Sequence, residues 1–160
     1  MNPIISTQAQ TLICEQVSHE LHNELQYRAF GAYAANLGLA RLAAYFMAQA
    51  DDEHAHAQKF MGYLDECNCP LAVPAVAAPL SMFIDLAEVA DLRFMLEMQT
   101  TDQIDALMAL AMVEDDYGLQ DLMQWFCRQQ KEERTAAARL VSLVKLSGGN
   151  ALLLELAFKA

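Results

Sequence analysis

Glu53 and His56 are the residues whose types and spacing first suggest metal chemistry. Three positions apart in an α-helix, a carboxylate and an imidazole lie on one face. The other residues at helical spacing on that face are apolar: Phe46, Ala50, Ala57 and Phe60. Ionisable groups directed into such surroundings need a partner or a metal ion. Taken alone, a Glu-x-x-His pair is also typical of an exposed helix surface.

Other stretches with helical patterns place further acidic or amide side chains among apolar neighbours. These are Glu24, Glu97, Gln130 and Glu133. Carboxylates that converge in an apolar interior repel one another unless they are protonated or bind cations. No lysine or arginine is obvious on the inward faces, so we expect two metal ions to balance the charge. Several carboxylates with one imidazole suit iron or manganese better than zinc, which favours more nitrogen or sulfur ligands.

Each of these positions also has a simpler interpretation. Glu24 could lie at the boundary between core and solvent, and Glu97 could be solvated beside Arg93. Glu132 and Glu133 could belong to one exposed run of charges, while His54 is expected at the surface. A metal centre is favoured because one convergent set accounts for several of these residues together.

The elements that must position these side chains are predicted to be five helices. Alanine, leucine, methionine, glutamate and glutamine are abundant and favour helix, whereas strand signals are nearly absent. Ser6 or Thr7, the Asp85–Glu88 capping box and Asn150 are suitable helix starts. The predicted helices cover about residues 7–36, 39–66, 85–114, 119–146 and 150–158.

The connections between these helices predict the topology. Short turns join the first helix to the second and the third to the fourth, so each pair forms an antiparallel hairpin. The second and third helices are joined by residues 69–84, which contain three prolines and no charge before Asp85. An extended connection of that length can run along the whole bundle and place the third helix parallel to the second. One long crossover is typical of the ferritin-like four-helix bundle.

Composition limits the function classes. The chain has 160 residues, which fits one domain, with 55% hydrophobic residues and a net charge of −11. This balance excludes disorder and disfavours nucleic-acid binding, which needs a basic surface. No apolar stretch is long enough to span a membrane, and the first residues do not resemble a secretory signal. We therefore expect a cytoplasmic protein with four reduced cysteines and no nucleic-acid or membrane partner.

The motifs together resemble those of the bacterial non-haem ferritins. The segments that carry the resemblance are Asn23-Glu24-Leu25, Asp52-Glu53-His54-Ala55-His56, Asp116-Tyr117, Gln124-Trp125-Phe126 and Gln129-Gln130-Lys131-Glu132-Glu133. The resemblance covers nearly the whole chain. It implies one ferritin-like domain over residues 1–160, with the bundle at about 7–146 and a short fifth helix at about 150–158.

The resemblance also implies an activity, which is oxidation of Fe²⁺ by O₂ or hydrogen peroxide and storage of ferric mineral in a cage of 24 subunits. Two irons would bind in each chain. The first would be held by Glu24, Glu53 and His56, with Glu53 bridging to a second held by Glu97 and Glu133, and Gln130 nearby. A weaker third site would use Asp52, Gln129 and Glu132. A di-iron peroxidase or oxygenase without a storage cage is the alternative.

Two further positions lead to expectations about mechanism and cofactor. Ferritins usually carry a tyrosine seven residues after the glutamate of the first helix, and counting from Glu24 leads to Gly31. The sequence therefore predicts an atypical mechanism, with Trp125 as a substitute electron donor. His54 follows Glu53 where haem-binding relatives carry methionine, so no haem is expected.

Overall fold

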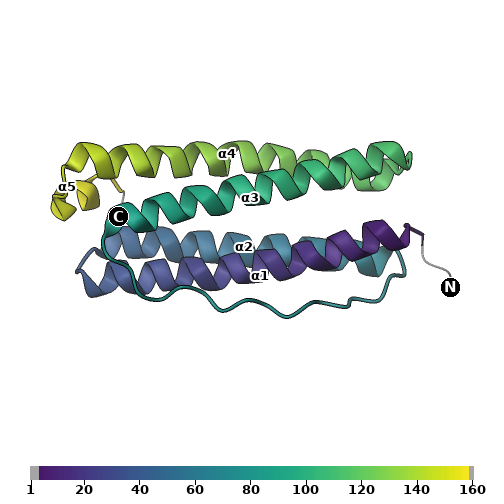
Figure 1. The fold of residues 1–160 in the computed structure, drawn as a ribbon, viewed down its shortest axis with the longest axis horizontal. Helices are drawn as coiled ribbons and strands as arrows, with labels where there is room; N and C mark the ends of the chain where they lie inside the picture. The colour runs from purple at the N-terminus through teal and green to yellow at the C-terminus, as the bar shows by residue number, and fades with distance from the viewer. Residues whose placement is uncertain (1–3, 159–160) are drawn as a thin grey trace.

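The computed structural model describes residues 4–158, which form a four-helix bundle with a short fifth helix (Figure 1). The helices are α1 (Thr7–Asn36), α2 (Ala40–Glu66), α3 (Leu86–Val113), α4 (Tyr117–Ser147) and α5 (Ala151–Leu156). No strand occurs among these residues. The predicted all-α fold is thus confirmed. The predicted domain limits of 1 and 160 fall in residues 1–3 and 159–160, outside the described part of the chain.

Local capping explains the helix bounds. Ser6 Oγ accepts a hydrogen bond from the Ala9 amide at 3.0 Å, and Asp85 Oδ1 accepts from the Glu88 amide at 2.9 Å. The fourth helix begins two residues before its predicted start because Asp116 Oδ1 accepts from the Leu119 amide. These contacts satisfy amides of the first turns, which have no partner within their own helices.

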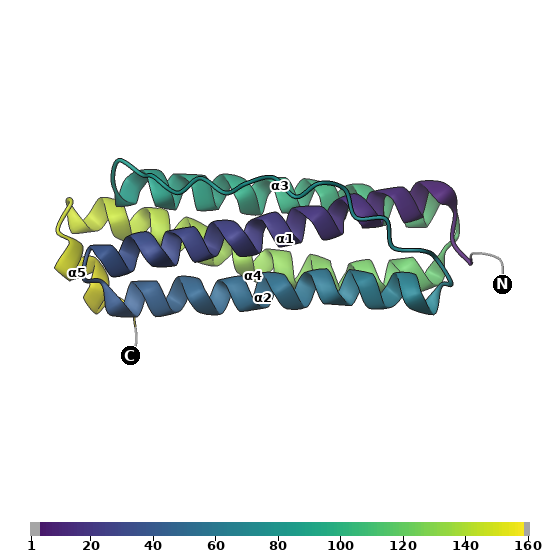
Figure 2. The ribbon, with the colours of Figure 1, turned by 90° about the horizontal axis from the view of Figure 1, so that it is seen from below.

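Two antiparallel hairpins, α1–α2 and α3–α4, make up the bundle, as predicted from the short turns. Residues 67–85 connect them and run the length of the bundle, so that α3 is parallel to α2 (Figures 1 and 2). The crossover contains no helix or strand. It lies beyond α1, on the side away from α3, in Figure 1, and it passes in front of α3 and α1 in Figure 2.

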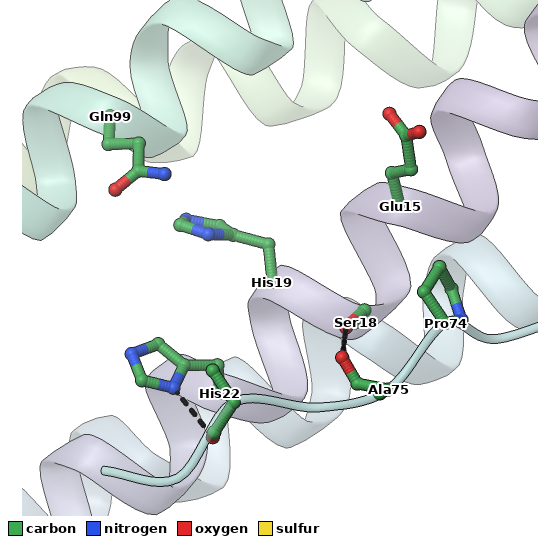
Figure 3. A pocket seen from close by; sticks show the side chains of 8 residues that line it. Glu15, Ser18, His19, His22, Pro74, Ala75 and Gln99 are labelled. Atoms are coloured by element: carbon green, nitrogen blue, oxygen red, sulfur yellow. Dashed lines mark hydrogen bonds between the residues drawn. The ribbon is translucent and has the colours of Figure 1, made fainter.

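A row of α1 side chains attaches this crossover to the bundle. Ser18 Oγ donates to the Ala75 carbonyl at 3.2 Å, and His22 Nδ1 donates to the Ala77 carbonyl at 2.9 Å (Figure 3). Gln26 uses both ends of its amide, donating to the Leu80 carbonyl at 2.9 Å and accepting from the Leu80 amide at 2.8 Å. The i, i+4, i+8 spacing puts the three side chains on one face of α1. The extended segment therefore satisfies backbone groups without forming a sheet.

The interior consists of two apolar clusters with a polar layer between them. One cluster includes Ile13, Val17, Phe60, Leu64, Ile104 and Phe126. The other includes Tyr27, Phe30, Leu42, Phe46 and Leu140. The buried polar residues of the layer include Glu20, Asn23, Glu53, His56, Glu97 and Gln130. Burial of so many polar groups is costly without partners, which marks this layer as the candidate site.

The short α5 packs against the start of α2. Leu39, which precedes α2, provides no side-chain cap. Instead, Glu155 of α5 accepts from the Arg41 amide at 2.6 Å and from the Leu42 amide at 3.1 Å. A carboxylate at a helix N-terminus satisfies free amides and interacts favourably with the helix dipole. None of the described helices combines the length and apolarity that crossing a membrane requires.

Candidate metal centre

Glu20, Glu53 and His56 converge in the middle of the bundle. Glu20 comes from α1, and the other two come from α2. The His56 Nδ1 atom lies 3.7 Å from Glu53 Oε2 and 4.0 Å from Glu20 Oε2. All three residues are buried, and each offers a ligand atom within 4.8 Å of the other two. Donor atoms that bind one cation at about 2.0–2.2 Å lie roughly 3–4 Å apart, so this spacing fits a metal site.

The same two carboxylate oxygens have no hydrogen-bond partner. Glu20 Oε1 accepts from Gln16 Nε2 at 2.7 Å, but Glu20 Oε2 and Glu53 Oε2 are buried and unpartnered. Buried acceptors are usually satisfied, and an exception needs an explanation. Here the unpartnered oxygens are the ones that face His56 Nδ1. A divalent cation at this point would satisfy both.

Burial also makes the acidic layer hard to ionise without a cation. Burial, with a contribution from Glu53, raises the pKa of Glu20 well above its usual range. Burial and the charges of Glu97 and Glu133 raise the pKa of Glu53 to about 8. A bound cation favours the ionised carboxylates and displaces their protons. The arrangement therefore fits a metal ion, with iron or manganese preferred over zinc by the oxygen-rich donor set.

Of the acidic residues of α1, the structure brings Glu20, and not the predicted Glu24, together with Glu53 and His56. The Glu24 side chain is 15% exposed, whereas that of Glu20 is fully buried. Glu24 pairs with Arg28 Nη2 and His54 Nδ1, each at 2.9 Å, on the outer side of the hairpin. Although its partial burial acts the other way, these hydrogen bonds lower the pKa of Glu24. The prediction of a surface position for His54 is confirmed.

The expected absence of a tyrosine is wrong for the same reason. Counting seven residues from Glu20 leads to Tyr27, not to Gly31. Tyr27 is fully buried, and its hydroxyl donates a short hydrogen bond to Glu97 Oε1. An aromatic hydroxyl therefore contacts the acidic layer, and the reason for expecting an atypical mechanism no longer holds.

Trp125 also contacts the centre. Its ring meets His56 edge to face, with 5.7 Å between centroids, and Lys59 Nζ lies 4.5 Å from the centre of the Trp125 ring. The need for Trp125 as a substitute donor was inferred from the missing tyrosine, and it disappears with that premise. The contact remains a packing interaction that orients the imidazole.

Glu97, Gln130 and Glu133 lie on the α3–α4 side of the layer. Glu97 is buried, and both of its oxygens are hydrogen-bonded, Oε1 by Tyr27 and Oε2 by Gln130 Nε2 at 3.2 Å. Glu133 is half-buried. Burial and the charge of Glu97 raise the pKa of Glu133 to about 7. The part of these residues in metal binding stays a prediction.

Arg93 is an inward cation that the sequence analysis did not identify. It is fully buried on α3, one turn before Glu97, rather than solvated beside that residue. Arg93 Nε donates to the Tyr27 hydroxyl at 3.1 Å, and Nη2 donates to Gln49 Oε1 and lies 3.6 Å from Glu133 Oε2. The expectation that no inward arginine balances the carboxylates is therefore wrong.

The residues of the predicted third site lie at the edge of the layer. Asp52 and Glu132 are exposed, and Gln129 is half-buried. Asp52 Oδ2 accepts from Gln49 Nε2 at 3.3 Å. A shorter carboxylate and a neutral amide favour weak binding, so this site remains a prediction of low affinity.

Known proteins share this fold and sequence. Residues 10–147 match the family described as ferritin-like domain. Ferritin BfrB of Mycobacterium tuberculosis is 32% identical over 149 residues, which cover 93% of this chain and 82% of that protein. The bacterial non-heme ferritin of Campylobacter jejuni is 27% identical over 153 residues, with coverages of 94% and 92%.

A solved structure agrees with these sequence relatives. The open pore ferritin of Archaeoglobus fulgidus superimposes with a TM-score of 0.89 at 25% identity, covering 95% of this chain and 98% of that one. The bundle, its crossover and its buried acidic layer are therefore found in a chain whose sequence matches ferritins along most of its length. We conclude that this protein belongs to the ferritin-like domain family.

Proposed function

We propose that this chain is the ferroxidase subunit of an iron-storage cage. Family membership supports iron storage and ferroxidase activity in general. The observation that carries the proposal for this chain is the pair of unpartnered buried oxygens, Glu20 Oε2 and Glu53 Oε2, facing His56 Nδ1. Fe²⁺ is the substrate that would bind there, with Glu97, Gln130 and Glu133 available to a second Fe²⁺.

The chain's own residues supply binding, orientation and proton handling. Each Fe²⁺ loses one electron, and two electrons with two protons convert O₂ to hydrogen peroxide, or peroxide to water. Glu20 and Glu53 have raised pKa values, so they release protons as Fe²⁺ binds. Tyr27 and Gln130 hold Glu97 in one orientation. The two apolar clusters on either side of the layer limit access of water.

Glu20 and Glu24 offer a matched test, because they are carboxylates one turn apart on the same helix. Apoprotein is loaded anaerobically with Fe²⁺, and the ferric absorbance is followed by stopped flow after mixing with O₂. We expect the rate of the fast phase to fall at least a hundredfold in Glu20→Gln and in Glu53→Gln. Glu24→Gln is expected to retain the wild-type rate. If Glu24→Gln abolishes the fast phase and Glu20→Gln leaves it intact, the proposed centre is wrong.

Assembly is tested separately from chemistry. We propose that 24 copies form the cage, as the resemblance to bacterial ferritins implies. With a chain of 17.8 kDa, such a cage has a mass of about 430 kDa. Sedimentation velocity distinguishes such a cage from a dimer. A dimer is expected for the alternative, a di-iron enzyme without a cage. A dimer with a working fast phase would refute storage while leaving the oxidation proposal intact.

A further inference from the structure

Arg93 puts a permanent positive charge inside the acidic layer. An arginine is not deprotonated under physiological conditions, and this one is fully buried. Its Nε and Nη2 atoms are held by Tyr27 and Gln49, respectively. Nη1 is buried without a partner. Neutral groups therefore do not satisfy the whole guanidinium, and nearby negative charge must balance it.

The charge of Arg93 is placed unequally relative to the carboxylates. Nη2 lies 3.6 Å from Glu133 Oε2, and Tyr27 links Nε to Glu97 through two successive hydrogen bonds. In the described part of the chain, the ion-pair contacts of Glu20 and Glu53 are instead to His56, which can be neutral. One half of the layer thus already holds a cation, and the other half has two unpartnered oxygens.

We propose that Arg93 is a built-in counter-cation for Glu97 and Glu133, so that the chain binds one divalent metal ion tightly and a second one only weakly. This rests on the proposed function. The tight ion occupies the half formed by Glu20, Glu53 and His56. A second ion near Glu97 and Glu133 meets the repulsion of the guanidinium, which is strong because the site is buried and poorly screened. Arg93 is a positioning residue in this scheme and need not touch iron.

Equilibrium binding tests the proposal without measuring oxidation. Apoprotein is titrated calorimetrically with Co²⁺, and with Fe²⁺ under anaerobic conditions. We expect one tight equivalent per chain in the wild type and a second at least tenfold weaker. Arg93→Gln removes the charge and keeps a hydrogen-bonding side chain, so the second equivalent is expected to tighten at least tenfold. Arg93→Lys keeps the charge, so it is expected to resemble the wild type.

The outcomes separate this inference from the proposed function. Wild type with two equivalents of equal affinity overturns the inference but leaves the metal centre in place. Wild type with no tight equivalent overturns the proposed function itself. Folded Arg93→Gln with an unchanged second equivalent, or Arg93→Lys with a tightened one, shows that the charge is not the cause. If circular dichroism shows that Arg93→Gln does not fold, Arg93→Met, which fills a similar volume without charge, replaces it. The affinities of the two equivalents in the wild type test the inference in either case.

Discussion

Raising the pH from 5 to 8 should destabilise the metal-free protein, because Glu53 is easier to protonate when folded than when unfolded. Burial raises the pKa of Glu53 from 4.5 to about 8. The folded state therefore holds a proton that the unfolded state releases above pH 4.5. The resulting stabilisation is complete below that pH and is lost progressively up to about pH 8. Glu133, with a pKa raised to about 7, acts in the same direction over a narrower range.

The size of this effect follows from the shift of Glu53. At about 1.4 kcal/mol per pH unit, a group whose pKa rises from 4.5 to about 8 contributes about 5 kcal/mol across the interval. For a chain of this length, that corresponds to roughly 10–20 °C in the unfolding midpoint. The assay is thermal unfolding followed by circular dichroism, in a chelator, at closely spaced pH values.

Two variants make the assay decisive. Glu20→Gln/Glu53→Gln lacks both fully buried carboxyls whose pKa values are raised, so its unfolding midpoint should depend much less on pH than that of the wild type. Glu132→Gln removes an exposed carboxylate and should leave the wild-type dependence unchanged. A wild-type midpoint that stays flat or rises from pH 5 to 8 would refute the reasoning. A midpoint of the double variant that follows the wild-type curve would do the same.

Two further predictions concern single hydrogen-bonding groups. Tyr27→Phe leaves Glu97 Oε1 and Arg93 Nε without their shared partner. The loss of two hydrogen bonds to charged groups should lower the free energy of unfolding in urea by roughly 3 kcal/mol. Tyr33→Phe, outside the acidic layer, should change it little. Glu155→Ala removes the acceptor of the first amides of α2 and should lower the free energy of unfolding by about 1–2 kcal/mol. Glu155→Gln keeps an acceptor oxygen and should be less destabilised. Equal stability of the wild type and both variants in urea would contradict the capping contact.

The fold could be predicted from the sequence because its main determinants are local. Ser6, Asp85 and Asn150 all cap helices as predicted. The prolines and the lack of charge in the crossover predicted an extended connection, and its length predicted a parallel third helix. Such features depend on neighbouring residues, so no knowledge of packing is needed to interpret them.

The residue that α1 contributes to the centre could not be predicted in the same way. Glu20 and Glu24 are one turn apart on the same helix, and the packing of α1 on α2 decides which of them is buried. Apolar periodicity was a poor guide because α1 also buries Gln16, Asn23 and Gln26. Two signals were nevertheless present. Arg28 follows Glu24 at the spacing of a surface ion pair, and Tyr27 follows Glu20 at the family's spacing.

Arg93 was missed for a different physical reason. A single arginine in a helix is usually exposed, because burying its charge is costly. Its burial depends on tertiary partners, Tyr27 from α1 and Gln49 from α2, which no local pattern on α3 reveals. The carboxylates predicted to lie inside the bundle were the available clue. An excess of buried negative charge can be balanced by a buried arginine as well as by a metal ion.

The attachment of the crossover to α1 has a consequence for how the acidic layer is aligned. The segment joins the end of α2 to the start of α3, and it is bonded to Ser18, His22 and Gln26 along its path. Sliding it along α1 breaks several of these bonds at once. A slip of α3 by one residue would move Glu97 by about 1.5 Å along the axis and turn it by about 100°. An external loop thus helps to set the axial register of the two hairpins, and shortening it should misalign the side chains of the acidic layer.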